Sequence, residues 1–224
     1  MRIHDSRRGR AVDLPPGPLH IHVHGPGLRA FITADVLCRT AARRRSRVLL
    51  TRSGPPPRPW PLTGFNVPDV PAGDAASAQV VVAEQDPPEA ACPKAAHLML
   101  VHPIEPSSLS SLADEDPVTL RMAMLSAPYR EPLRLPEQAA DARARLGRWR
   151  ALLAEWARSP GRPMSRRHAA DAEAALAQDL DSPAALAVLE ELAADPAAAP
   201  GAKLETFIHL DLLLALDLVR DIGR

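Results

Sequence analysis

Apolar and polar residues alternate at residues 19–24, which is the pattern of a half-buried β-strand. A glycine-proline-glycine turn follows at residues 25–27, and residues 28–43 carry apolar side chains near helical spacing. Residues 47–51 form a short apolar run of strand length. This order of strand, turn, helix and strand predicts a βαβ unit within a parallel sheet.

Two further segments, residues 78–82 and 97–101, are apolar throughout, as buried parallel strands tend to be. Residues 53–76, which precede them, are rich in proline. Because proline lacks the N–H group that helices and sheets use, we expect a long loop there.

The second half of the chain has the apolar spacing of helices. We predict them over residues 116–126, 136–158, 165–178, 182–194 and 202–221. In the longest one, Trp149 and Trp156 lie on the apolar face and are expected in the core. The sequence therefore predicts an α/β fold, with a reduced Rossmann-like parallel sheet over residues 14–115 and an α-helical bundle over residues 116–224.

Composition excludes several classes of protein. The 224 residues include 27 basic and 27 acidic side chains, so a general nucleic-acid coat, and DNA as a partner, are not expected. No apolar run is long enough to cross a membrane, and residues 1–12 lack the apolar segment of a secretory signal. Two cysteines are too few for a disulfide scaffold, so we expect a cytoplasmic protein with reduced thiols.

Four sequence blocks, in order, resemble cysteinyl-tRNA synthetases of the class I type. Residues 23–26 (VHGP) are similar to the end of that family's first strand, and Arg29 with residues 35–37 (DVL) to the helix that follows. Residues 125–133 (LSAPYREPL) and 179–189 (DLDSPAALAVL) resemble two helical segments of the family. The mycothiol-pathway cysteine ligases share this scaffold, and the resemblance does not separate the two families.

The resemblance implies a longer enzyme that activates cysteine with ATP, of which this chain would be a truncated form. Neither histidine of the family's "HIGH" motif has a counterpart after residues 25–27. The segment that matches the "KMSKS" loop, residues 104–112, contains no lysine. A similar short run at residues 164–167 lies in the helical half, where that motif does not belong. Losing one electrostatic clamp typically costs about 10²–10³ in rate, so we expect an inactive enzyme.

The family also binds cysteine through a zinc ion, and two residues are candidate ligands here. His24 stands at the position of the family's first cysteine ligand, and Glu84 falls near its glutamate ligand. The remaining cysteine and histidine have no match, since residues 80–82 (VVV) occupy the histidine's region. Two ligands do not make a tetrahedral zinc site.

His20, His22 and His24 alternate along one strand and should share one face. One interpretation is a metal or phosphate site. The favoured interpretation is a solvent-facing stripe on an edge strand, since same-face side chains stand about 7 Å apart along a strand and three of them do not easily grip one ion.

Two other segments are candidate anion sites. Gly25 and Gly27, between a strand and a helix, suit a phosphate-binding turn, and Arg29 would be the anion's partner. A simple turn is the favoured interpretation, because the glycines are fewer than in a full phosphate-binding motif and Pro26 lacks an N–H donor. The basic residues 43–47 suit either RNA backbone or the solvated end of a helix, and the second interpretation is favoured because the chain has no net positive charge.

The two cysteines and the Tyr129–Arg130 pair also have expected roles. Cys38 is expected in the core and Cys92 in an exposed loop or helix start, without a catalytic partner for either. We expect Tyr129 and Arg130 to dock the helical half onto the sheet, with the guanidinium on a carboxylate. The serines at residues 107–111 are expected in a capped loop.

These observations favour an inactive paralogue of the synthetases that binds a protein or small-molecule partner. One alternative is a minimal ATP-dependent cysteine ligase with a tRNA or small-amine acceptor, for which ATP and zinc would be the cofactors. The other is an RNA-binding module with tRNA as its partner.

Overall fold

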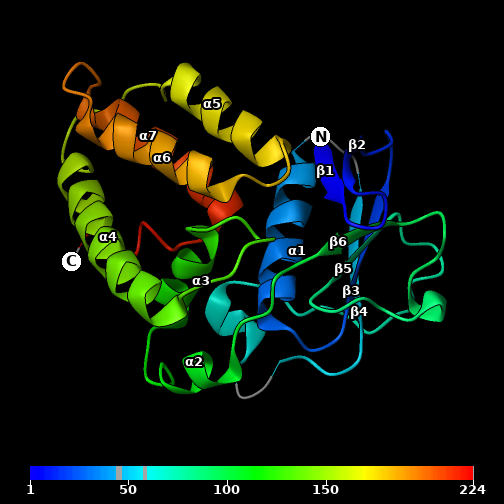
Figure 1. The fold of residues 1–224 in the computed structure, drawn as a ribbon. Helices are drawn as coiled ribbons and strands as arrows, with labels where there is room; N and C mark the ends of the chain where they lie inside the picture. The colour runs from blue at the N-terminus through cyan, green and yellow to red at the C-terminus, as the bar shows by residue number, and fades with distance from the viewer. Residues whose placement is uncertain (44–46, 58–59, 224) are drawn as a thin grey trace.

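A four-stranded parallel sheet forms the centre of the first half of the chain. The computed structural model describes residues 1–43, 47–57 and 60–223. Its strands, β3 (Leu19–His24), β4 (Val48–Ser53), β5 (Val80–Ala83) and β6 (His97–Leu100), lie in the order β4-β3-β5-β6. Helix α1 (Leu28–Ala42) connects β3 to β4 and lies between the sheet and the later helices (Figure 1). The predicted α/β fold, with a Rossmann-like sheet followed by a helical bundle, is confirmed.

The two faces of this sheet differ in what covers them. Residue pairing places His22 beside Thr51 on β4 and Val81 on β5, so these side chains share one face. The alternating residues Ile21 and Val82 belong instead to the large hydrophobic core that includes α1. Loops cover the histidine face, where a small separate cluster consists of Ala75, Ala78, Val81, Cys92, Ala96 and Leu98.

The proline-rich connection between β4 and β5 helps to cover both faces of the sheet. Its short 3₁₀ helix η1 (Leu62–Phe65) packs Phe65 into the large core. Farther along, the backbone of Gly73 pairs with Arg52, and Ser77 reaches His20 on the opposite face. The segment predicted as a plain loop therefore wraps around the edge of the sheet. A second 3₁₀ helix, η2 (Glu89–Ala91), lies between β5 and β6.

An N-terminal hairpin was not predicted. Strands β1 (Arg2–Asp5) and β2 (Arg10–Asp13) pair antiparallel beside β6, and the Ser6 amide donates to the Leu98 carbonyl at 2.7 Å. Ile3 from this hairpin is fully buried. The hairpin thus covers a part of the sheet that the Rossmann-like unit leaves open.

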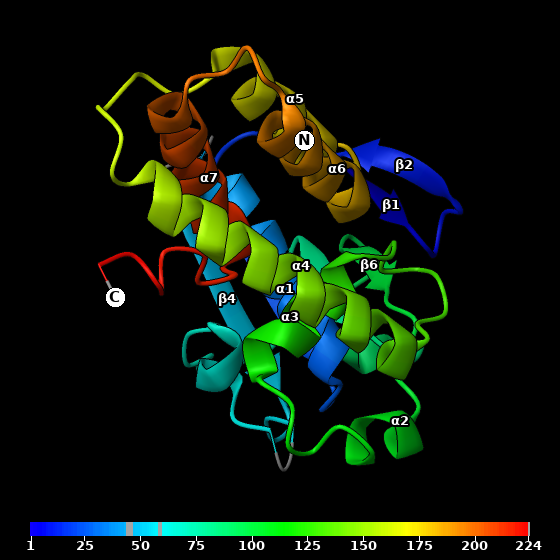
Figure 2. The ribbon, with the colours of Figure 1, turned by 90° about the vertical axis from the view of Figure 1, so that its left-hand side faces the viewer.

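In the described part of the chain six helices follow the sheet, and they lie on the side of α1 that faces away from the strands (Figure 2). They are α2 (Pro106–Ser110), α3 (Pro117–Leu125), α4 (Leu135–Trp156), α5 (Arg166–Ala177), α6 (Ser182–Ala194) and α7 (Pro200–Leu214). Trp149 and Trp156 are buried edge-on against Phe207, which confirms their place in the core. No helix in the described ranges has both the length and the apolar character that crossing a membrane requires.

Two helix predictions need correction. The serine-rich stretch expected as a loop contains the short helix α2, which proline starts well because its fixed φ suits the first helical turn. The last helix ends at Leu214 rather than near residue 221, because Ala215 adopts the left-handed conformation at φ 53°. Asp211 then accepts hydrogen bonds from the amides of Leu216 (2.7 Å) and Leu218 (2.9 Å), which turns the chain back.

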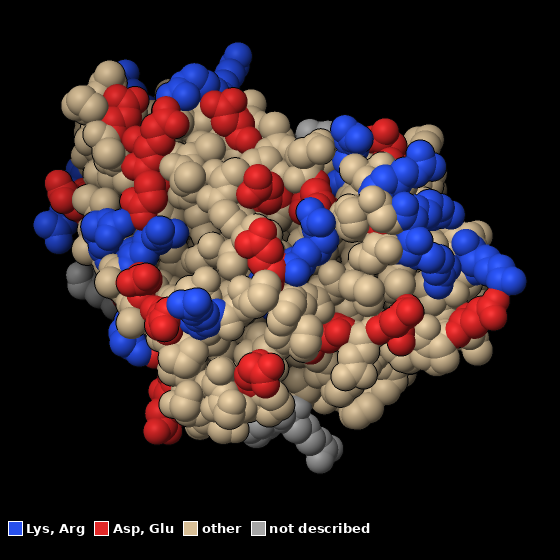
Figure 3. All heavy atoms as spheres, in the orientation of Figure 1, with Lys and Arg blue, Asp and Glu red and all other residues tan. Residues whose placement is uncertain are grey.

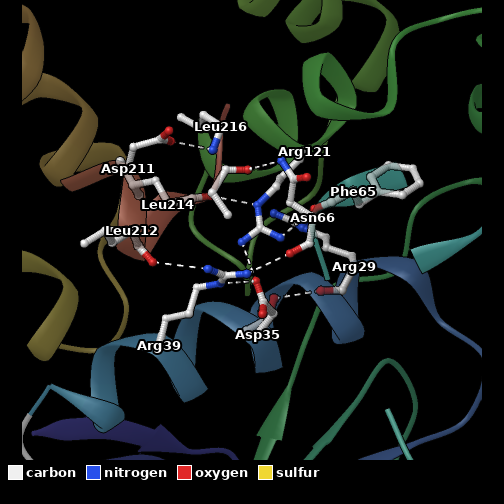
Figure 4. Close-up of polar contacts among 12 residues, drawn as sticks. Arg29, Asp35, Arg39, Phe65, Asn66, Arg121, Asp211, Leu212, Leu214 and Leu216 are labelled. Atoms are coloured by element: carbon white, nitrogen blue, oxygen red, sulfur yellow. Dashed lines mark hydrogen bonds and ion pairs between the residues drawn. The ribbon is translucent and has the colours of Figure 1, made fainter. Parts of the chain in front are cut away.

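A buried arginine connects α1 to the helical half (Figure 4). Arg121 on α3 is fully buried and donates to the Asp35 carboxylate at 2.6 Å. It also donates to the carbonyls of Phe65 (2.9 Å) and Leu214 (2.7 Å). Arg39 donates to the same Asp35 oxygen at 2.8 Å. One hydrophobic cluster runs through both halves of the chain, so the division at residue 115 stays a prediction.

Candidate functional site

A pocket of about 430 Å³ opens at the carboxyl ends of β3 and β5. It is lined by His24, Gly25, Pro26, Gly27, Glu84, Gln85, Asp86 and Pro88. Strand β4 lies on one side of β3 and β5 on the other, so the order of the strands reverses here. Open α/β sheets bind ligands at such a position. A smaller adjoining hollow of about 190 Å³ adds Trp60 and Pro57 from the proline-rich connection.

The carboxylate of Glu84 occupies the N-terminus of α1. One of its oxygens accepts a hydrogen bond from the Ala30 amide at 3.2 Å, and the Arg29 amide also contributes. A Cβ atom on Gly27 would lie only 2.1 Å from the Glu84 carboxyl carbon, so only glycine leaves room for this contact. The first turn of a helix attracts anions through its unpaired amides and dipole. Here that anion is a side chain of the protein itself.

Burial is the largest influence on Glu84 and raises the pKa of its carboxyl group, while the Ala30 and Arg29 amides oppose this shift. The other charged side chain on the pocket wall is Asp86, which is exposed. With Glu84 ionised, the pocket therefore presents negative rather than positive charge. That balance favours an amine or another cation over a polyphosphate.

Arg29, the expected partner of a bound anion, lies elsewhere. Its guanidinium donates to the carbonyls of His102 (3.1 Å), Pro128 (2.8 Å) and Glu131 (2.6 Å). Burial lowers the pKa of Arg29 to about 10. These contacts hold α1 against the segment that follows α3, so the structure gives Arg29 a role in packing.

The three histidines of β3 are not the exposed stripe that the sequence favoured. Strand β3 is flanked on both sides, and His20 and His22 are buried while His24 is half-buried at the pocket. Their ring nitrogens contact the hydroxyl groups of Ser77, Thr51 and Ser53. The edge-strand interpretation is therefore wrong: it failed because β5 pairs with β3 and the segment near Ser77 covers this face.

The zinc ion that the resemblance implies does not fit the residues of this pocket. His24 and Glu84 do line one pocket, but Glu84 is held by the α1 amides. Across the described ranges, no group of three or more His, Cys, Asp or Glu side chains could hold a metal ion. ATP also fits poorly, because its phosphates would meet the negatively charged Glu84 carboxylate at the N-terminus of α1.

Tyr129 and Arg130 both reach the same carboxylate. The Tyr129 hydroxyl donates to Asp179 at 2.7 Å, and an Arg130 nitrogen lies 3.0 Å from the other carboxyl oxygen. The His4 amide donates to Asp179 as well, at 2.6 Å. This contact joins the segment after α3 to the α5–α6 turn and to strand β1. The docking role assigned to Tyr129 and Arg130 stays a prediction.

Neither cysteine lies in a reactive environment. Cys38 is half-buried against the core, whereas Cys92 is fully buried rather than exposed. Burial raises the pKa of both thiols, which keeps them protonated near neutral pH.

Basic side chains gather over the N-terminal hairpin on the face drawn in Figure 3. The hairpin's exposed arginines are Arg2, Arg7, Arg8 and Arg10. Of the basic cluster predicted at residues 43–47, residues 44–46 lie outside the described part of the chain. Arg43 contacts His209 at 2.9 Å and Glu173 at 3.7 Å, both on the helical half. RNA binding by this cluster stays a prediction.

No family model matches the chain. It is 38% identical over 92 residues to the L-cysteine:1D-myo-inositol 2-amino-2-deoxy-alpha-D-glucopyranoside ligase of Thermobispora bispora, and 42% identical over 80 residues to the enzyme with the same name from Streptomyces griseus. The enzyme of Streptomyces coelicolor is 40% identical over 80 residues. Part of this chain is homologous to cysteine ligases.

The homology to cysteine ligases is limited in extent. The matched stretches make up 39% and 35% of this chain, and they span about a fifth of the length of the Thermobispora and Streptomyces griseus ligases (22% and 19%). The expected resemblance is supported to that extent, as a partial homology to the cysteine ligases.

The sequence did not point to every residue that shapes this site. Thr51 and Ser53 are ordinary residues of a strand, and their role depends on the pairing of β4 with β3. Asp86 is an exposed acid in a connecting segment, and no pattern along the chain marks it. His24, Gly25, Gly27 and Glu84 were predicted, and the structure brings these four together around one pocket.

Proposed function

We propose that this chain is a cysteine-ligase-like paralogue that does not form an aminoacyl adenylate and binds a small ligand at the β3–β5 pocket. The observation that carries the proposal is the Glu84 carboxylate on the N-terminal amides of α1. An anionic side chain there repels a nucleotide phosphate and already uses the donors that would hold it.

The rest of the pocket agrees with this proposal. Arg29 is engaged with three carbonyl groups, so its charge is not directed at a ligand. Gly25 and Gly27 line the pocket, and its volume suits a small molecule. Because Glu84 and Asp86 carry the charge, a ligand with an amine is favoured.

Cysteine-dependent exchange between ATP and pyrophosphate tests the loss of adenylation. The Streptomyces coelicolor ligase serves as the positive control under the same conditions. We expect no exchange above background from this chain. Robust exchange that depends on cysteine contradicts the proposal.

The second candidate is a minimal ATP-dependent cysteine ligase. It is favoured by the partial homology to cysteine ligases. This candidate requires stoichiometric zinc in the purified protein and loss of exchange activity in His24→Ala. Metal analysis that finds no zinc, together with failure to bind a cysteinyl-adenylate analogue, excludes it.

A further inference from the structure

An unbroken row of hydrogen-bonding groups runs across the buried histidine face of the sheet. It begins at Ser77, whose hydroxyl oxygen lies 2.9 Å from His20 Nδ1. His20 Nε2 is 2.7 Å from Thr51 Oγ1, and the same oxygen is 2.9 Å from His22 Nδ1. His22 Nε2 is 3.0 Å from Ser53 Oγ, which lies 2.9 Å from His24 Nδ1.

The two ends of this row lie in different surroundings. Ser77 is exposed to solvent, whereas His24 is half-buried on the wall of the β3–β5 pocket. Between them, His22 is only 1% exposed and Thr51 is 7% exposed. The row therefore connects solvent to the pocket through the interior of the protein. Strand pairing fixes it, because His20, His22 and His24 stand directly beside Leu49, Thr51 and Ser53 on β4.

Each member of the row can both donate and accept one hydrogen bond. A neutral imidazole has one N–H group and one lone pair on its two nitrogens, and a hydroxyl group has one proton and lone pairs. His22 stays neutral near pH 7, because burial, together with repulsion from His20 and His24, lowers its pKa to about 4. Asp74, the other charged group near it, opposes this shift.

These properties allow two arrangements of the protons. In one, all three histidines carry the proton on Nδ1, every hydrogen bond points toward Ser77, and His24 Nε2 presents a lone pair. In the other, all three carry it on Nε2, every bond points toward His24, and His24 Nε2 presents an N–H group. A mixed arrangement leaves a hydroxyl hydrogen without an acceptor in the row, or gives two ring lone pairs a single hydroxyl hydrogen to share, and both are costly.

We propose that the row from Ser77 to His24 is a proton relay that connects solvent to the β3–β5 pocket, with His24 as the group that exchanges a proton with a bound amine or thiol. His24 Nε2 accepts the ligand's proton, and the Nδ1 proton passes to Ser53. Ser53 passes its own proton to His22, His22 to Thr51, Thr51 to His20 and His20 to Ser77. Ser77 releases one proton to water, so one proton enters and one leaves.

The relay is independent of the proposed loss of adenylation. It needs neither ATP nor a metal ion, and it serves any ligand of the pocket that gains or loses a proton on binding.

Nitrogen-15 NMR of the imidazole rings provides the first test. At pH 7 we expect all three rings in the same tautomer, either all Nδ1–H or all Nε2–H, in the intact protein without ligand. Opposite tautomers in neighbouring rings overturn the proposal, and this measurement requires no variant.

Exchange of the His22 ring proton with water provides the second test. The combination of Thr51→Val and Ser53→Ala removes the hydroxyl groups on both sides of His22, while Thr51→Ser keeps a hydroxyl group and serves as the matched control. We expect exchange in the combined variant to be slower by about tenfold or more than in the control. Equal exchange rates show that water reaches His22 by local opening and overturn the relay. If the combined variant does not fold, Thr51→Val alone, which closes the route from Ser77, is compared with the same control at His20 and His22.

Discussion

The two faces of the central sheet carry different kinds of side chain, although the same strands form both. The face toward α1 presents aliphatic side chains such as Ile21 and Val82, and it belongs to a core that continues into the helical half. The opposite face has His20, His22, Thr51 and only a small apolar cluster beneath loops. Because successive side chains of a strand point to opposite faces, β3 alone contributes aliphatic side chains to one face and histidines to the other. The apolar contacts that stabilise the fold are therefore concentrated on one face of the sheet, and the titratable side chains on the other.

The arginine network on the α1 side should be the most sensitive point of the structure. Arg121→Met removes the fully buried partner of Asp35 and leaves the carbonyls of Phe65 and Leu214 without this donor. We expect the free energy of unfolding to fall by about 3–5 kcal/mol. Chemical denaturation measures this loss. Arg39→Met, which removes a partly exposed partner of the same carboxylate, should cost about 1 kcal/mol or less, and equal effects would contradict the account.

Adjacent residues on β6 allow the two faces to be compared directly. Met99 belongs to the large core and Leu98 to the small cluster on the histidine face, and both are buried. Replacing a buried Met or Leu by Ala typically costs about 2–5 kcal/mol, and more where the surroundings cannot relax. We expect Met99→Ala near the upper end of this range and Leu98→Ala near the lower end. A larger loss for Leu98→Ala, measured by thermal and urea unfolding, would reverse the assignment of the stable face.

Acid should weaken the histidine face first. The folded-state pKa of His22 is about 4, below its ordinary value of 6.5, so the unfolded chain binds this proton more readily. The stabilising effect is complete above about pH 6.5 and is lost as the pH falls toward about 4, by at most about 3 kcal/mol. Unfolding free energies measured from pH 7 to pH 4 report this slope. His22→Gln should flatten it, and an unchanged slope in that variant would assign the effect to other groups.

Glycine-to-alanine substitutions at the pocket and in the helical half should have opposite effects on stability. Gly27→Ala places a methyl group within 2.1 Å of the Glu84 carboxyl carbon, so we expect the carboxylate to leave the α1 amides at a cost of about 1–2 kcal/mol. Gly147→Ala in α4 meets no atom within 4 Å and should stabilise the protein by about 0.5–1 kcal/mol. Amide NMR shifts at Ala30 identify the displaced carboxylate, and a stable Gly27→Ala variant with unchanged shifts would contradict the contact.

Much of the fold follows from local patterns in the sequence. Alternation at residues 19–24 and the apolar runs near Val81 and Leu98 locate strands, because the apolar and polar pattern of a segment reflects which of its side chains are buried. The aspartate-proline start of α3 is equally local, and the Asp116 side chain accepts from the Val118 amide at 3.3 Å. The hairpin of β1 and β2 has no such pattern, since its two strands are four residues each and their exposed positions carry charged side chains.

The candidate site was predicted only in part, for a physical reason. Spacing showed that His20, His22 and His24 share a face, but whether that face is buried depends on β5 and on the segment around Ser77. Likewise, the position of Glu84 after a strand did not reveal that its carboxylate turns onto α1. Contacts between segments more than 50 residues apart decide both cases, and no local pattern contains them.

We propose that Glu84 takes the place of a nucleotide phosphate at the N-terminus of α1, and calorimetric titration with ATP tests this role directly. For the unmodified chain we expect no binding tighter than about 1 mM, and for Glu84→Ala, which frees the amides and removes the negative charge, an affinity at least about tenfold higher. Micromolar binding of ATP to the unmodified chain, with no gain in Glu84→Ala, would contradict the account.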